Sequence, residues 1–203
     1  MPETNSPLRI LGFAGSLRRR SYNRRLLDLA ATTAPGRIQL LVHDIHDVPL
    51  FDEDVEADTH GGPEGVRLLR AAIAAADGVL IATPEYNQSM PGVLKNVLDW
   101  LSRKDPAYGE VLAGKPVAIV GATPGRWGTR VAQAQVRHAL SAMEALVMAT
   151  PQVYIAGAGG QGPDADPFDA ATARRLGTFL EAFREWIGRV SLAGDGRFAA
   201  PES

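Results

Sequence analysis

The chain contains no cysteine, which excludes disulfides, thiolate metal sites and cysteine nucleophiles. Aromatic residues make up only 6% of it, and the formal net charge of −2 gives no field that attracts nucleic acid or an anionic membrane. No uncharged apolar run is long enough to cross a bilayer, and the polar N-terminus lacks the pattern of a secretory signal. These absences predict a soluble, cytoplasmic protein with neither a membrane nor nucleic acid as its partner.

Length and composition are those of an ordinary globular domain. With 203 residues, 45% of them hydrophobic, the chain is long enough to bury a substantial core. It shows no internal repeat and no linker that would separate a second domain. We therefore predict a single domain over residues 1–203, with its core at about 8–190 and loose termini at 1–7 and 191–203.

Short apolar runs alternate with amphipathic stretches along the chain. The runs predict five buried strands: Leu8–Ala14, Ile38–His43, Val79–Thr83, Val117–Ala122 and Leu146–Ile155, the last interrupted at Pro151. The amphipathic stretches predict five helices: Asn23–Ala34, Pro63–Ala76, Gly92–Arg103, Arg130–Met143 and Phe168–Val190. This alternation predicts an α/β fold, a flavodoxin-like three-layer sandwich around a five-stranded parallel sheet in the order 2-1-3-4-5.

The loop after the first strand carries the donors that a phosphate monoester requires. It brings the hydroxyls of Ser16 and Ser21, the guanidinium of Arg18 and the amide of Asn23 to the start of a helix. The free N–H groups and the dipole of a helix N-terminus favour an anion, and arginine adds paired charge-assisted bonds. Two alternatives are a solvated basic turn with an ordinary serine cap, and a nucleic-acid or targeting patch built from the local arginines. We prefer phosphate binding because a basic patch does not require serine and asparagine at these places.

A second loop follows the third strand and is restricted at both ends by Pro84 and Pro91. Between them, Glu85, Tyr86 and Asn87 are predicted to present backbone N–H groups to the edge of an isoalloxazine ring. The Tyr86 side chain is predicted to form an aromatic wall for the ring or to pack at a subunit boundary. The alternative, a simple helix-entry loop, explains Pro91 but not the residues from Pro84 to Asn87.

A third loop, after the fourth strand, contains Thr123, Gly125 and Arg126 and reaches the same sheet edge. Glycine lets the backbone approach a ligand closely, and Arg126 is a candidate for a dinucleotide phosphate. The acidic segment Asp44–Gly62 is predicted as a long surface loop that borders the pocket. The histidines do not group as metal ligands, so no metal site is predicted.

These motifs resemble those of the NADPH-dependent FMN reductase family, which includes flavodoxin-like quinone, chromate and azo-dye reductases. The matching pieces are Gly15-Ser16-x-Arg18-x-x-Ser21-x-Asn23, Pro84-Glu85-Tyr86-Asn87-x-Ser89-x-Pro91-Gly92 and Gly125-Arg126-x-Gly128. The resemblance covers about residues 8–190 and implies FMN as cofactor, with NADPH or NADH as co-substrate. By the same resemblance, the first loop would hold the FMN phosphate, the second would line the isoalloxazine, and the Thr123 loop would border its pyrimidine end.

The activity that this resemblance implies is hydride transfer from NAD(P)H to FMN, and then reduction of a quinone, free flavin, azo compound or similar small-molecule acceptor. The cofactor performs this chemistry, so no protein side chain is nominated as catalytic. The family tends to form homodimers and homotetramers, and one of these is expected here. An alternative is an FMN-binding electron carrier or redox-sensing protein with little NAD(P)H turnover, although such carriers tend to be strongly acidic and this chain is not.

Overall fold

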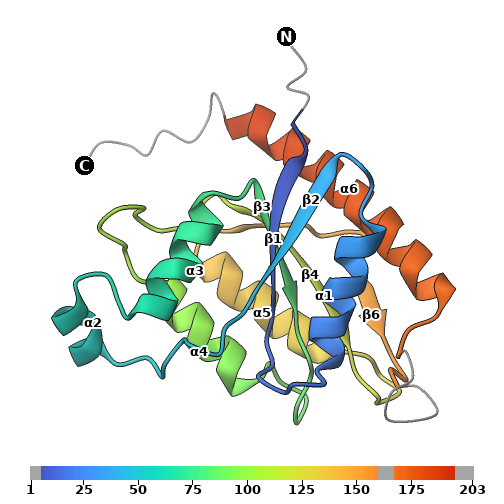
Figure 1. The fold of residues 1–203 in the computed structure, drawn as a ribbon, viewed down its shortest axis with the longest axis horizontal. Helices are drawn as coiled ribbons and strands as arrows, with labels where there is room; N and C mark the ends of the chain where they lie inside the picture. Colours follow the sequence, from blue (N-terminus) through green and yellow to red (C-terminus); the bar gives the residue numbers. More distant parts are fainter. Residues whose placement is uncertain (1–5, 160–166, 195–203) are drawn as a thin grey trace.

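A parallel β-sheet forms the centre of the computed structural model, which describes residues 6–159 and 167–194 (Figure 1). The strands are β1 (Leu8–Ala14), β2 (Ile38–His43), β3 (Gly78–Ala82), β4 (Pro116–Ala122), β5 (Leu146–Val147) and β6 (Val153–Ile155). Their order is β2-β1-β3-β4-β5, and β6 also pairs with β4. The predicted flavodoxin-like fold and strand order are confirmed.

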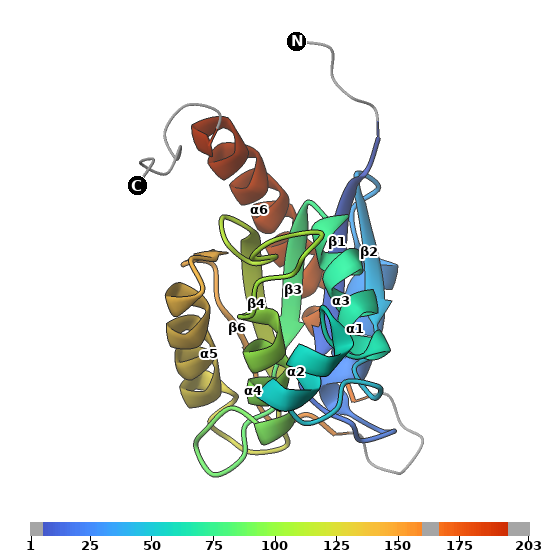
Figure 2. The same ribbon diagram turned by 90° about the vertical axis from the view of Figure 1, so that its left-hand side faces the viewer.

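Helices cover both faces of this sheet. They are α1 (Tyr22–Thr33), α2 (Glu53–Thr59), α3 (Glu64–Ala74), α4 (Gly92–Leu101), α5 (Arg130–Ala142) and α6 (Ala170–Gly194). One hydrophobic cluster joins α1 and α6 to the sheet, and another joins α3, α4 and α5 to its other face. In Figure 2, α3 and α4 lie in front of the sheet and α6 behind it, which gives the three layers.

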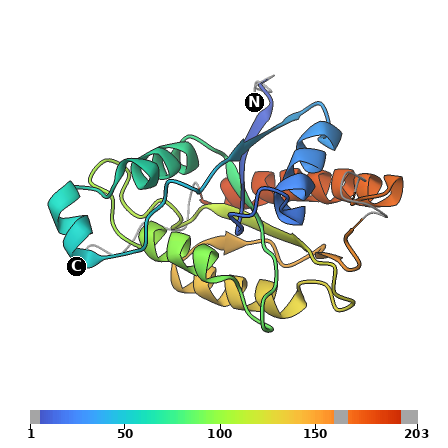
Figure 3. The same cartoon turned by 60° about the horizontal axis from the view of Figure 1, so that its bottom comes forward.

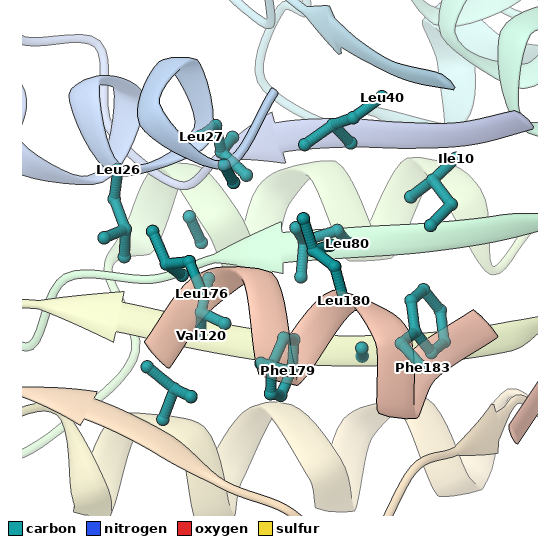
Figure 4. Packing of buried hydrophobic residues seen from close by; sticks show 14 of the residues in the cluster. Ile10, Leu26, Leu27, Leu40, Leu80, Val120, Leu176, Phe179, Leu180 and Phe183 are labelled. Carbon is teal, nitrogen blue, oxygen red and sulfur yellow. The ribbon is translucent and has the colours of Figure 1, made fainter. Parts of the chain in front are cut away.

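The strands are continuously apolar because both faces of the sheet are covered. Successive residues of β3 point into different clusters: Leu80 packs with α1 and α6, whereas Val79 and Ile81 pack with the helices of the opposite face. Figure 4 shows the first of these clusters, to which α1 contributes Leu26 and Leu27 and α6 contributes Leu176, Phe179, Leu180 and Phe183. The apolar runs thus place the strand ends, and the loops that follow them, on a rigid scaffold.

The last predicted strand is not continuous, so the sheet has six strands where five were predicted. β5 pairs with Pro116 and Val117 at the start of β4, and β6 pairs with the end of β4, from Val120 to Ala122. Pro151 lies between β5 and β6, and proline has no N–H to donate to a strand ladder. Two short strands therefore occupy one edge of the sheet.

The prediction of a pure loop over Asp44–Gly62 is wrong, because this segment contains α2. The Asp52 side chain accepts a hydrogen bond from the N–H of Asp54 at 2.9 Å and so caps the helix. Acidic residues in its first turn further suit the helix dipole.

The termini differ in part from the prediction. Helix α6 begins at Ala170 and continues to Gly194, so residues 191–194 are helical where a loose end was predicted. Residues 1–5 and 195–203 lie outside the described residues. Of the helices within the described ranges, none is both long enough and apolar enough to traverse a membrane.

Candidate active site

Three loops meet at the carboxyl edge of the sheet, after β1, β3 and β4 (Figure 3). Hydrogen bonds tie them to one another: Gly15 N–H donates to Ala82 O at 2.9 Å, and Asn23 pairs with the backbone of Ala122. The Glu85 carboxylate reaches the first turn of α5, which follows the third loop. This crevice is where ligands bind in open α/β sheets. The three predicted loops therefore lie side by side at one edge of the sheet.

The loop between β1 and α1, which we call the phosphate loop, gathers polar groups at the start of α1. The Ser16 hydroxyl accepts a hydrogen bond from Arg18 N–H, and the Ser21 hydroxyl accepts one from Arg24 N–H, each at 3.3 Å. Ser21 is the N-cap of α1 and is buried, whereas Ser16 is half-buried. The exposed Arg18 guanidinium lies 5.5 Å from the centre of the Tyr22 ring. Arg18 and both serines thus lie on this loop, and their binding of a phosphate stays a prediction.

The side chain of Asn23 does not have the role predicted from its residue type, which was to donate a hydrogen bond to a phosphate. Its Nδ2 donates to Ala122 O and its Oδ1 accepts from Ala122 N–H, both at 2.9 Å, and the residue is 1% exposed. The side chain therefore joins α1 to the end of β4. Any contribution of Asn23 to anion binding rests on its backbone N–H in the first helical turn, and it stays a prediction.

The loop after β3, which we call the ring loop, contains a tight turn. Tyr86 N–H donates to Ser89 O at 3.1 Å, and Ser89 N–H donates to Tyr86 O at 2.9 Å. Asn87 and Gln88 have φ values of 52° and 57°, a left-handed conformation that requires support from its surroundings. The prediction that Tyr86 offers its N–H to a ligand is therefore wrong, because the turn uses it. The Tyr86 side chain is 55% exposed beside the site.

Glu85 anchors the ring loop to α5. Its Oε2 accepts hydrogen bonds from the N–H groups of Val131 and Ala132, both at 2.9 Å. The N-cap residue, Thr129, makes no side-chain cap of its own, so Glu85 supplies the cap from another loop. A carboxylate at this end of a helix is stabilised by the dipole. One carboxylate oxygen of Glu85 thus caps the helix, which makes the side chain an anchor for the ring loop.

Gln135 of α5 makes a second anchor, which sequence reasoning missed. Its Oε1 accepts hydrogen bonds from Ser89 Oγ at 2.6 Å and from Met90 N–H at 3.2 Å. Its Nε2 donates to Gln88 O at 3.3 Å. One amide thereby holds both sides of the strained turn. No local pattern reveals this, since Ser89 and Gln135 are 46 residues apart.

The third loop is held by the sheet edge. Thr123 N–H donates to Ile155 O at 3.0 Å, and Thr123 Oγ1 accepts a hydrogen bond from Gly125 N–H at 3.3 Å. The Arg126 guanidinium lies 4.7 Å from the ring centre of Trp127, whose side chain is 69% exposed. A cation stacked on an exposed aromatic ring offers both charge and a flat surface at the open side of the loop.

The fold and these loops define a class: a flavodoxin-like α/β protein with hydroxyl and guanidinium groups at the start of α1 and with exposed aromatic side chains on the ring loop and the third loop. Residues 8–160 match the profile of the family described as NADPH-dependent FMN reductase. The chain belongs to this family. It is therefore an FMN-dependent oxidoreductase that uses NAD(P)H.

Individual relatives agree with this assignment. An NAD(P)H-dependent FMN reductase from Pseudomonas aeruginosa is 43% identical over 190 residues, which cover 90% of this chain and 97% of the relative. A 2-hydroxy-1,4-benzoquinone reductase from Burkholderia sp. is 39% identical over 187 residues, covering 89% and 96%. Among solved structures, FerB, a flavoenzyme NAD(P)H:(acceptor) oxidoreductase from Paracoccus denitrificans, superposes with a TM-score of 0.76 at 36% identity. That match covers 90% of this chain and 98% of FerB.

Proposed function

We propose that the chain reduces quinones with NAD(P)H, using FMN bound across the three loops. The observation that carries this proposal is the linked set of hydrogen bonds that joins the phosphate loop, the ring loop and the third loop at one sheet edge. The relatives named as quinone reductases support the choice of acceptor. The proposal includes a cytoplasmic location, where NAD(P)H is supplied.

The residues of the phosphate loop fit a phosphate monoester. The first-turn N–H groups of α1, the hydroxyl of Ser16 and the guanidinium of Arg18 are donors or cations gathered at one helix terminus. Tyr86 on the ring loop and Trp127 on the third loop present exposed aromatic surface, and Pro84 stiffens the ring loop. This combination of an anion site and flat apolar walls suits a flavin mononucleotide.

Bound FMN supplies the redox chemistry, since its ring accepts two electrons from NAD(P)H and delivers them to an acceptor. The residues of the chain bind and orient. Ser16 and Arg18 would hold the phosphate end, while Glu85 and Gln135 keep the ring loop in one conformation through α5. Arg126 would attract the phosphates of the dinucleotide or an anionic acceptor to the open side. No side chain is assigned as a catalytic acid or base.

The test is the visible absorption spectrum of the purified protein supplied with FMN. We expect a retained flavin spectrum that bleaches when NADPH is added without oxygen and returns when benzoquinone is added. Absence of retained flavin would contradict the proposed site. A flavin that is retained but not bleached would favour an electron carrier, and failure of benzoquinone to restore the spectrum would reject the proposed acceptor.

We also propose that the protein assembles as a homodimer or homotetramer. Tyr86, Trp127 and Val131, all more than one-third exposed, lie on the ring loop and around the start of α5, which Glu85 brings together. Exposed large apolar side chains that gather in this way mark an interaction surface. Sedimentation equilibrium would distinguish a monomer from either assembly.

Replacing Gln135 by leucine is expected to weaken the binding of riboflavin and of FMN by the same factor, roughly tenfold. Leucine preserves the helix but removes the three hydrogen bonds that hold the ring-loop turn. The matched comparison is Arg18→Ala, which should weaken FMN binding and leave riboflavin unaffected, because riboflavin has no phosphate. Fluorescence titration of both flavins measures these effects. A Gln135→Leu variant that loses affinity for FMN alone would contradict the assignment of the ring loop.

A further inference from the structure

His46 connects the segment after β2 to the phosphate loop. Its Nε2 lies 2.9 Å from Leu17 O, and its Nδ1 makes a short contact with Asp44 Oδ1. A carbonyl oxygen and a carboxylate are acceptors, so each ring nitrogen must carry a hydrogen for both bonds to form. Only the protonated, positively charged imidazolium satisfies both partners. A neutral His46 keeps one bond and loses the other.

The bond to Leu17 bears on the groups that are predicted to hold phosphate. Leu17 C=O and Arg18 N–H belong to one planar trans peptide, so they point in opposite directions. The carbonyl is held by His46, and the N–H donates to the Ser16 hydroxyl at 3.3 Å. The orientation of this single peptide therefore depends on His46 and determines what the Ser16 oxygen contacts.

The charges around His46 favour its protonated form. Asp44 accepts from the His46 ring and from its N–H, and Asp44 Oδ2 also lies 3.8 Å from the guanidinium of Arg24 in α1. The hydrogen bond to Asp44 raises the pKa of His46 above its usual 6.5, and the Leu17 carbonyl and Asp47 act in the same direction. Because the pKa of His46 is raised in the folded protein, the stabilisation of the fold by the charged imidazolium is fully present below pH 6.5 and is lost as pH rises from that value through the raised pKa.

We propose that His46 is a positioning residue for the phosphate loop: in its charged form it holds the Leu17 carbonyl and so keeps Ser16 and Arg18 arranged to bind the FMN phosphate. Its deprotonation releases the Leu17 carbonyl, because the remaining hydrogen stays with the charged acceptor, Asp44. The affinity for FMN, and not for riboflavin, then falls as pH rises. This inference rests on the proposed function, since it concerns the same cofactor site.

The experiment compares the wild type with His46→Gln, whose amide offers a donor that does not titrate. Dissociation constants for FMN and riboflavin are measured by fluorescence from pH 5.5 to 9. At each pH, the dissociation constant of the wild type is divided by that of His46→Gln. This ratio cancels the effect of ionisation of the FMN phosphate itself, whose second pKa is ~6. We expect the wild type to lose about fivefold in FMN affinity relative to His46→Gln across the range, with no change in the riboflavin ratio.

A ratio for FMN that does not vary with pH, or a riboflavin ratio that varies equally, would overturn the inference. A wild type that binds neither flavin would overturn the proposed function as well, so the two failures are distinguishable. If His46→Gln does not fold, Asp44→Asn replaces it, because the asparagine amide can donate to Nδ1 of a neutral imidazole and so leaves the Nε2 hydrogen for Leu17 O. Its FMN affinity should therefore fall less with rising pH than that of the wild type; coincident profiles would also reject the proposal.

Discussion

The Asn23→Leu variant is expected to lose about 3 kcal/mol in free energy of unfolding, because two buried backbone groups lose their partner. Leucine has a similar volume, but it cannot pair with the N–H and C=O of Ala122, which the asparagine amide satisfies at 2.9 Å on both sides. Each unsatisfied buried group costs about 1–3 kcal/mol. Urea unfolding monitored by circular dichroism measures the change.

The control for this variant is Thr32→Ala in the same helix. Thr32 Oγ1 donates to Leu29 O at 2.9 Å on an exposed face of α1, so its loss should change stability by no more than about 0.5 kcal/mol. A similar loss in both variants would show that the pairing with Ala122 adds nothing. Asn23→Leu should also weaken FMN binding, since α1 would no longer be held to the end of β4.

The free energy of unfolding of the Gly121→Ala variant is expected to be lower than that of the wild type by about 3 kcal/mol or more, since a methyl group has no space at this position. A Cβ on Gly121 would lie 2.1 Å from Thr129 Oγ1 and 2.4 Å from the backbone oxygen of Thr83. The Thr83 oxygen belongs to the backbone, so relief of the clash requires a strand to move. Thermal unfolding followed by circular dichroism measures the loss.

Gly121 also bears on function, because its two close neighbours lie at the start of the ring loop and at the end of the third loop. Where Gly121→Ala still folds, we expect its affinity for FMN to fall with its stability. Gly188→Ala is the matched control: it lies in helix α6, and apart from the adjoining helix backbone no heavy atom lies within 4 Å of its added Cβ. Alanine there should stabilise the helix by up to about 1 kcal/mol. Equal effects at the two positions would contradict the packing argument.

The local sequence pattern was sufficient to predict the strands and helices that form the scaffold. The bounds of β1 and β2 were predicted to the residue, because a run of buried apolar side chains is a property of the segment itself. The alternation of such runs with amphipathic helices was enough to predict the strand order, since right-handed crossovers leave few possible arrangements of the strands in a sheet. The same reasoning placed the three loops at one edge of the sheet, and the comparisons confirmed the family that their motifs resemble.

The tertiary structure alone decided which polar groups hold those loops in place. Asn23 looks like a phosphate donor in the sequence, but packing brings it to Ala122, 99 residues away, and its amide is used there. Glu85 reaches Val131 and Gln135 reaches Ser89, each across 46 residues of chain, and His46 reaches Leu17 across 29. The reason is physical: residue type states what a polar side chain can bond to, whereas the packing of helices on the sheet decides which partner lies within reach.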